Sequence, residues 1–230
     1  MRMIWIHMII AIFCLVSCSQ VHQETFVADE HVENSESIVE RLKGAGIDVY
    51  VDLLPEDVSE ERKHPITHIV LHFTSNAAIT PEDPYEVEAI RHTFIDYGVS
   101  AHFLIGREGE VYQWVPVDRV AYHAGKGRLE QFPEYEDRLN HYSIGIEMMG
   151  IGTKDEMIPM MDSEIYDLIA PSDIGYTDAQ YETVEKLIDV IIAYHPEIKR
   201  DRNHIIGHDE YAPDRKTDPG SLFEWEKIGF

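Results

Sequence analysis

Hydrophobic residues along this chain follow two spacings in turn, and these predict strands and helices. Short runs rich in β-branched and aromatic residues, typical of strands, occupy residues 66–73, 101–105, 110–115 and 143–148. Apolar residues at helical spacing occupy residues 84–97 and 177–192. Strands interleaved with long amphipathic helices predict an α/β fold, a single domain with a central mixed β-sheet flanked by helices.

Local signals mark where several of these elements begin or end. Gly98 follows the first helical pattern and tolerates the left-handed backbone of a helix C-terminus. Residues 177–180 (Thr-Asp-Ala-Gln) have the form of a capping box and predict the start of the second helix, which stops before Pro196. Residues 106–109, with a glycine at each end, predict a hairpin between two of the strands. Residues 37–42 suggest a short helix and residues 47–53 a half-buried strand, neither with an evident function.

The first 17 residues have the pattern of an export signal. Arg2 precedes a nearly uninterrupted apolar run to Val16, too short to span a bilayer comfortably as a mature helix. The sequence Leu-Val-Ser-Cys at 15–18 resembles a bacterial lipobox and predicts cleavage after residue 17 and lipidation of Cys18; an ordinary secretory signal is the alternative. Residues 18–36 would form a lipidated, polar and flexible tether. We expect an exported lipoprotein, anchored to a membrane by its lipid and facing the cell wall or periplasm.

The charge and cysteine content narrow the class of partner. The chain carries 19 basic and 43 acidic residues, a formal net charge of −24. This acidity argues against nucleic acid, because phosphate binding needs concentrated Lys and Arg. Signal cleavage would remove Cys14, and lipidation of Cys18 would leave no thiol for a disulfide. We expect a monomer stabilised by its core, and by a metal if one is bound.

Candidate chemistry is concentrated near the C-terminus, on a loop punctuated by Pro and Gly. His208 and Asp218 lie ten residues apart, and Lys216 comes two residues before the carboxylate. A neutral imidazole and a carboxylate can supply half of a zinc site, and the ammonium a fixed positive charge.

Five motifs in a fixed order then indicate a family. They are THIVLHFT (67–74), SAHFLI (100–105), AYHAG (121–125), SIGIE (143–147) and GH (207–208) followed by KTDPG (216–220). Together they resemble the type 2 N-acetylmuramoyl-L-alanine amidases, the zinc enzymes that share their fold with the peptidoglycan recognition proteins. The resemblance covers residues 66–220, so we divide the chain into a signal peptide (1–17), the tether (18–36), an N-terminal extension packed on the domain (37–65) and a zinc amidase domain (66–230).

The resemblance implies a set of metal ligands. His72, His208 and Asp218 match the family's three zinc ligands, although His68 lies on the same face of the strand as His72 and is a rival. Two imidazoles and one carboxylate would leave a fourth position of Zn²⁺ open for water, as in catalytic rather than structural zinc sites. His204 and His102 are expected to pack or form internal hydrogen bonds.

The resemblance also implies catalytic roles. Glu147 matches the general base that takes a proton from water and returns it to the leaving amine, and its strand predicts a partly dry surrounding that raises its proton affinity. Lys216 matches a residue that stabilises the oxyanion. A solvent-facing glutamate and a solvated lysine are the alternatives. His123 and Asn140 lie at positions that would bind substrate or hold the loops of the cleft.

The expected activity is zinc-dependent hydrolysis of the amide between N-acetylmuramic acid and L-alanine. The substrate would be peptidoglycan or a muropeptide, and the sequence does not choose between intact wall, released muropeptide and anhydro-sugar product. The alternative is a non-catalytic peptidoglycan-binding module of the same fold. Residues 150–176 could form a lip over the cleft or a flap packed on the protein's own core.

Overall fold

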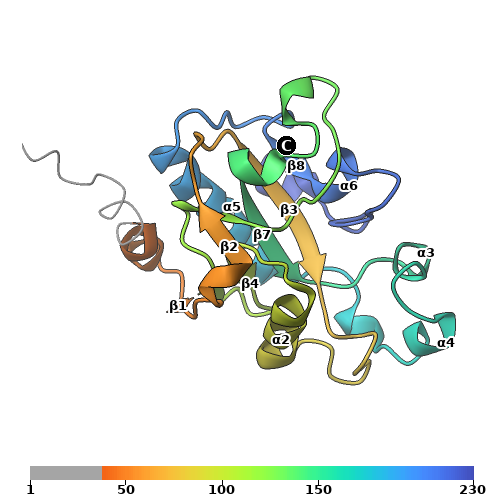
Figure 1. Cartoon of the computed structure of the whole chain (residues 1–230). Helices are drawn as coiled ribbons and strands as arrows, with labels where there is room; N and C mark the ends of the chain where they lie inside the picture. The colour runs from red at the N-terminus through yellow and green to blue at the C-terminus, as the bar shows by residue number, and fades with distance from the viewer. Residues whose placement is uncertain (1–37) are drawn as a thin grey trace, which may run out of the picture.

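A six-stranded mixed sheet lies at the centre of the computed structural model, which describes residues 38–230 (Figure 1). Its strand order is β1-β5-β4-β7-β3-β8. The β4–β5 pair is the predicted hairpin and is antiparallel, whereas all other neighbours are parallel. The strands are β1 (Val49–Val51), β3 (His68–Thr74), β4 (Phe103–Ile105), β5 (Val111–Gln113), β7 (Ser143–Met149) and β8 (Ile205–Gly207). The mixed α/β architecture expected from the sequence is therefore confirmed.

Helix α5 (Asp178–Tyr194) covers one face of this sheet (Figure 1). It begins at the predicted capping box, in which Thr177 and Gln180 bond each other's backbone N–H groups. Side chains that alternate along β3 and β7 pack against it, among them Ile69, Leu71, Ile144, Ile146 and Met148. Because successive strand residues point to opposite faces, the side chains of Ser143 and Glu147 leave from the other face, and Gly145 lies between them on that face without a side chain.

Helix α2 (Val87–Tyr97) packs on that second face, where Ile90 and Phe94 contact Leu104 and Trp114. The helix ends at Gly98, which adopts the predicted left-handed conformation (φ 63°). It begins at Val87 rather than at Pro84, because the Glu86 carboxylate accepts hydrogen bonds from the backbone N–H groups of the first turn.

The segment before residue 66 belongs to the same folded unit. Residues 38–44 are helical, with Ile38 and Leu42 fully buried in the core beside α5, and β1 forms one edge of the main sheet. A second, two-stranded antiparallel sheet joins β2 (Ser59–Glu61) to β6 (Arg119–Ala121). The partly buried Arg62 guanidinium donates to the carbonyls of Val117, Arg119, His141 and Ser143.

Residues 150–176 form a side lobe that contains α3 (Lys154–Met157) and α4 (Ser163–Tyr166) (Figure 1). Met157, Met161 and Ile169 are buried there against Phe73, at the end of β3. Met160 is instead half exposed. The remaining short elements are η1 (Glu56–Val58), η2 (Pro133–Tyr135), η3 (Leu139–Tyr142), η4 (Pro171–Asp173), α6 (His208–Tyr211) and η5 (Trp225–Ile228).

The predictions for the signal peptide, Cys18 and the tether concern residues outside the described part of the chain. Within residues 38–230, every helix is too short or too polar to cross a bilayer.

Candidate metal centre and active-site cleft

The site is built at the ends of three neighbouring parallel strands. His72 on β3 is the register partner of Glu147 on β7, so their side chains leave the same face of the sheet side by side. On the other side of β3, β8 ends at Gly207, and His208 follows as the first residue of α6. The backbone carbonyl of Asp218 accepts a hydrogen bond (2.8 Å) from the Asp209 N–H, which ties the Asp218 loop to α6.

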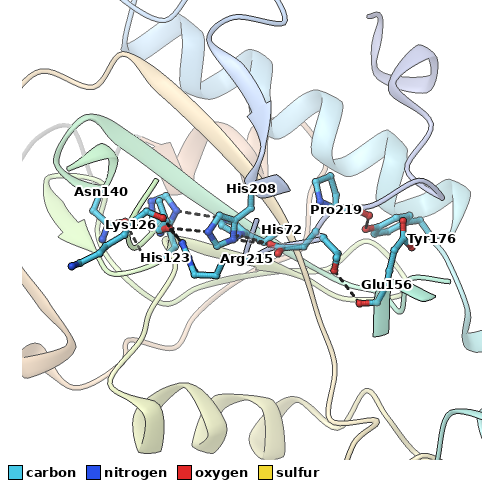
Figure 2. A network of polar contacts seen from close by, with 12 residues as sticks. His72, His123, Lys126, Asn140, Glu156, Tyr176, His208, Arg215 and Pro219 are labelled. Carbon is cyan, nitrogen blue, oxygen red and sulfur yellow. Dashed lines mark hydrogen bonds and ion pairs between the residues drawn. The ribbon is translucent and has the colours of Figure 1, made fainter. Parts of the chain in front are cut away.

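His72, His208 and Asp218 converge on one point, as the resemblance implies. Their nearest side-chain nitrogen and oxygen atoms all lie within 4.8 Å of one another, and all three residues are buried. Asp218 Oδ2 lies 2.8 Å from His72 Nδ1 and 3.0 Å from His208 Nδ1, and the two Nδ1 atoms are 3.0 Å apart (Figure 2). The geometry is that of a group that could hold a metal ion.

The hydrogen bonds around the two imidazoles test whether a cation fits. His208 Nε2 lies 2.8 Å from the backbone carbonyl of Ala124, which can only accept, so Nε2 carries the proton and Nδ1 presents a lone pair. His72 Nε2 lies 3.0 Å from His123 Nδ1, a ring nitrogen that can accept the proton of neutral His72. Burial, and then the neighbouring His208, lower the pKa of His72 to about 4, which keeps the ring neutral. Two lone pairs and a carboxylate oxygen thus face one another, an arrangement that suits a metal ion.

Glu147 is buried beside this cluster with one oxygen, Oε2, that has no hydrogen-bond partner among the described residues. Burial, and secondarily the charge of Asp218, raise the pKa of its carboxyl well above the ordinary value, while Lys216 opposes the shift. A buried polar atom without a partner is costly, and a buried carboxyl with a strongly shifted pKa in a cleft marks a candidate functional residue. The carboxyl therefore lies beside the three converging side chains and binds a proton more readily than an ordinary glutamate.

A cavity of about 410 Å³ opens onto these groups. It is lined by six predicted site residues, His72, His123, Glu147, His208, Lys216 and Asp218. Tyr97, at the end of α2, and Met160, from the side lobe, also line it, with 80% and 49% of their surfaces exposed. The cleft therefore combines a polar floor with apolar groups.

His123 and Asn140 have internal contacts. The Asn140 side-chain oxygen accepts hydrogen bonds from the backbone N–H groups of His123 (3.2 Å) and Ala124 (2.7 Å). Asn140 thus holds the loop that carries His123. Holding the loops of the cleft is one of the two roles considered for Asn140 from the sequence. The His123 ring lies between His72 and Ser143.

Three further histidines discussed from the sequence have their hydrogen-bond partners outside the group formed by His72, His208 and Asp218. His68 bonds Thr67 and stacks on His204, among the rings of Phe132 and Tyr135. His204 in turn bonds Asp201 (2.7 Å). His102 Nδ1 accepts from the Gly145 N–H. These contacts agree with the internal packing expected for His102 and His204, and they place His68 in an aromatic cluster.

Residues 62–221 match the N-acetylmuramoyl-L-alanine amidase family, Amidase_2. This span is most of the chain and contains all seven predicted site residues from His72 to Asp218. The chain belongs to this family.

Individual members of the family show how far the likeness extends. The chain is 37% identical to the 1,6-anhydro-N-acetylmuramyl-L-alanine amidase AmpD of Escherichia coli (strain K12) over 130 residues, 56% of either protein. It therefore spans about half the length of the curated relatives it matches. The crystal structure of a Se-Met AmpD derivative superposes with a TM-score of 0.58 at 29% identity, covering 77% of this chain and 92% of that one. The amidase AmiD from E. coli, in complex with anhydro-N-acetylmuramic acid-L-Ala-D-gamma-Glu-L-Lys, superposes with a TM-score of 0.52 at 27% identity, covering 72% and 57%.

Two residues near the site of this amidase-family chain were not singled out by their sequence. Glu156 in the side lobe accepts from the Ser221 N–H (2.7 Å), and its own carbonyl accepts from the Thr217 hydroxyl (3.1 Å). Tyr176 donates to the Pro219 carbonyl (2.6 Å; Figure 2). Both hold the loop that carries Asp218. The only sequence signal for Glu156 is its place three residues after Thr153, in a capping box.

Proposed function

We propose that this protein is a zinc-dependent N-acetylmuramoyl-L-alanine amidase, which hydrolyses the amide between the lactyl group of N-acetylmuramic acid and L-alanine. The observation that carries the proposal is the meeting, in one cleft, of three converging metal-ligand atoms and a buried carboxyl whose Oε2 has no partner within residues 38–230. Family membership supplies the reaction class, and the cleft supplies the groups that this class requires.

His72, His208 and Asp218 would hold the zinc ion. Histidine nitrogen and carboxylate oxygen are ordinary zinc ligands, and three protein ligands leave a position open, as catalytic sites require. When bound, zinc supplies Lewis-acid activation of the amide carbonyl and of the attacking water.

Glu147 would handle the protons of the reaction. It takes one proton as the water oxygen adds to the carbonyl carbon, and it returns that proton to the L-alanine nitrogen as the carbon–nitrogen bond breaks. The products are the lactyl carboxylate and a peptide with a free amino terminus. Its raised pKa supports this cycle, because a carboxyl with a pKa above the ordinary value is a stronger base towards the attacking water.

Lys216 would stabilise the oxyanion that forms on the carbonyl oxygen. It lines the same cavity as Glu147 and the three ligands, and its positive charge acts on both His72 and Glu147. A fixed cation in a water-poor cleft lowers the energy of a negative charge that develops during the reaction.

The substrate would be peptidoglycan or a muropeptide derived from it. The names of AmpD and of the AmiD complex specify anhydro-sugar compounds for those two proteins. For this chain we propose cleavage of the same muramoyl–alanine bond, and the form of the sugar is to be decided by experiment. A non-catalytic recognition module is the less favoured function, because the cleft retains all three ligands together with Glu147.

We further propose, from the sequence of residues 1–36 alone, an exported lipoprotein anchored through Cys18, and separately that the protein is a monomer. Processing would separate residues 1–17 and leave the tether before the folded domain. A Cys18→Ser protein that remains in the membrane fraction would contradict the anchor.

The test of the proposed activity offers the purified protein two substrates, intact peptidoglycan and a soluble anhydro-muropeptide. Chelator-sensitive release of peptides that begin with L-alanine, restored by added Zn²⁺, is expected from at least one of them. Binding without release, by zinc-loaded protein, would favour the recognition module.

A further inference from the structure

A chain of hydrogen bonds behind the metal ligands starts at a backbone carbonyl. The Ser143 hydroxyl donates to the carbonyl of Leu139 (2.7 Å). A hydroxyl has one proton, so its oxygen can only accept from the second neighbour, His123 Nε2, 3.2 Å away. His123 Nε2 must therefore carry a proton for this contact to be a hydrogen bond.

The protonated Nε2 of His123 determines the direction of the next hydrogen bond, between His123 and His72. A neutral imidazole has one N–H, so His123 Nδ1 presents a lone pair. That lone pair faces His72 Nε2 at 3.0 Å and accepts its proton. His72 Nδ1 is then left without a proton and faces Asp218 and His208.

We propose that Ser143 and His123 form a positioning relay, which fixes the tautomer and the ring orientation of His72 and thereby the affinity of the site for zinc. Neither residue touches the reacting atoms; both act through His72. The inference rests on the proposed metal site and is independent of which bond is cleaved. It gives His123 a role different from substrate binding, because both ring nitrogens already have partners within the protein.

Strand β7 is shaped to hold this relay. Ser143 and Gly145 leave the same face of the strand, and the ring of His123 lies directly over Gly145: a Cβ atom there would come within 2.4 Å of His123 Cγ. Asn140 holds the backbone of His123 from the other side. The ring is therefore held by the hydrogen bond to Ser143, by its packing over Gly145 and by the bond from its backbone to Asn140. A residue that orients a metal ligand needs such support.

The experiment measures Zn²⁺ affinity of the full chain by competition with a chromophoric chelator. Loss of an outer-shell partner weakens metal binding by about 10- to 100-fold. We expect about 10-fold weaker binding for Ser143→Ala and about 100-fold for His123→Leu, with partial recovery in His123→Gln, whose amide oxygen can accept from His72. Thr183→Val is the matched control, because the Thr183 hydroxyl also donates to a carbonyl from a buried position, on α5.

A second readout separates positioning from general damage to the fold. Long-range ¹H–¹⁵N spectra of the zinc-free protein report which nitrogen of each imidazole carries the proton. We expect His72 and His123 as Nε2–H tautomers in the wild type and in Thr183→Val, and a mixed population for His72 in His123→Leu.

Zinc affinities of the relay variants equal to that of Thr183→Val, or an Nδ1–H tautomer for wild-type His72, would overturn the relay. Zinc binding that depends on the relay, in a protein that hydrolyses no muramoyl–alanine bond, would overturn the proposed function and leave the relay intact. A wild-type protein that binds no zinc would overturn both.

Discussion

His72 and Glu147 are register partners on the parallel strands β3 and β7, and this pairing brings a metal-ligand candidate and a proton-transfer candidate to one face of the sheet. Ile146 and Met148, the neighbours of Glu147 on its strand, point to the opposite face and pack under α5. The strand that builds the hydrophobic core thus also builds the floor of the cleft.

Replacement of Glu147 by Gln is expected to lower kcat by a factor of about 10² to 10⁴, the usual contribution of a general acid–base group. Zinc binding is expected to persist, because Glu147 is not one of the three converging ligands. The free energy of unfolding is expected to stay the same or rise, since a neutral amide replaces a buried carboxyl of which one oxygen has no partner in the part of the chain that the structure describes.

The measurements are steady-state rates, zinc content and urea unfolding, with the exposed Glu182→Gln on α5 as the control. A Glu147→Gln protein with wild-type kcat would contradict the assignment of the proton-transfer role.

Replacement of Lys216 by Met is expected to lower kcat/KM by about 10²- to 10³-fold, as for other groups that stabilise an oxyanion. The pH profile is expected to change as well. Lys216 lowers the pKa of Glu147, so its removal raises that pKa, and the acid limb of kcat/KM moves to higher pH. Lys216→Arg keeps the charge and should leave the limb in place. An unchanged limb in Lys216→Met would show that the ammonium does not act on Glu147.

Replacement of Glu156 by Gln is expected to lower stability by about 1 kcal/mol, because an amide has one acceptor oxygen where the carboxylate has two. The two carboxylate oxygens accept from Ser221 on one side and from Thr153 on the other. Weaker zinc binding should accompany the loss, since the Asp218 loop depends on these bonds. Glu164→Gln, an exposed residue of the same lobe, is the control for both measurements. Equal zinc affinity in the two variants would show that the contacts of Glu156 do not influence zinc binding.

Replacement of Tyr97 or Met160 by Ala is expected to raise KM with little change in kcat. Tyr97 is largely exposed and Met160 half exposed, yet both line the cleft, so they offer apolar surface that a bound substrate would cover. Leu168→Ala is the control, because it removes an apolar side chain whose exposed fraction (68%) lies between those of Tyr97 and Met160 and which is not among those lining the cleft. A fall in kcat at constant KM would place these residues in catalysis rather than in binding.

Acid is expected to destabilise the protein through His68. Burial, and then the charge of His204, lower the His68 pKa from 6.5 to about 4, so the unfolded chain binds a proton more readily than the folded chain between these values. Stability is therefore lost as pH falls from about 6.5 towards 4. Between pH 7.5 and 5 the contribution of His68 is about 2 kcal/mol. Urea unfolding of the zinc-free His68→Gln protein should show a pH dependence smaller by about that amount, and an unchanged dependence would contradict it.

Local sequence patterns were sufficient for the central elements. Helix α5 starts at its capping box, α2 stops at Gly98, and the hairpin lies at residues 106–109, because each of these signals acts within a few residues. The match to the family's ordered motifs then placed His72, His208 and Asp218 as candidates that the fold does bring together.

Local patterns could not predict contacts between segments that lie far apart in the sequence. His68 and His72 lie four residues apart on one face of β3, and only the tertiary neighbours separate them, an aromatic cluster for His68 and a carboxylate for His72. The bond from Ser221 to Glu156 joins residues 65 positions apart, so neither residue signals it locally. Ser143 likewise reads as an ordinary strand-start serine until His123 is placed beside it.

The most direct test of the central claim is hydrolysis in H₂¹⁸O, followed by mass spectrometry of both products. The expected products are a lactyl carboxylate that carries one ¹⁸O atom and an unlabelled peptide with a free L-alanine amino group, and both are lost when zinc is chelated. Label in a peptide carboxylate, cleavage of a glycosidic bond, or unchanged turnover without metal would contradict this claim.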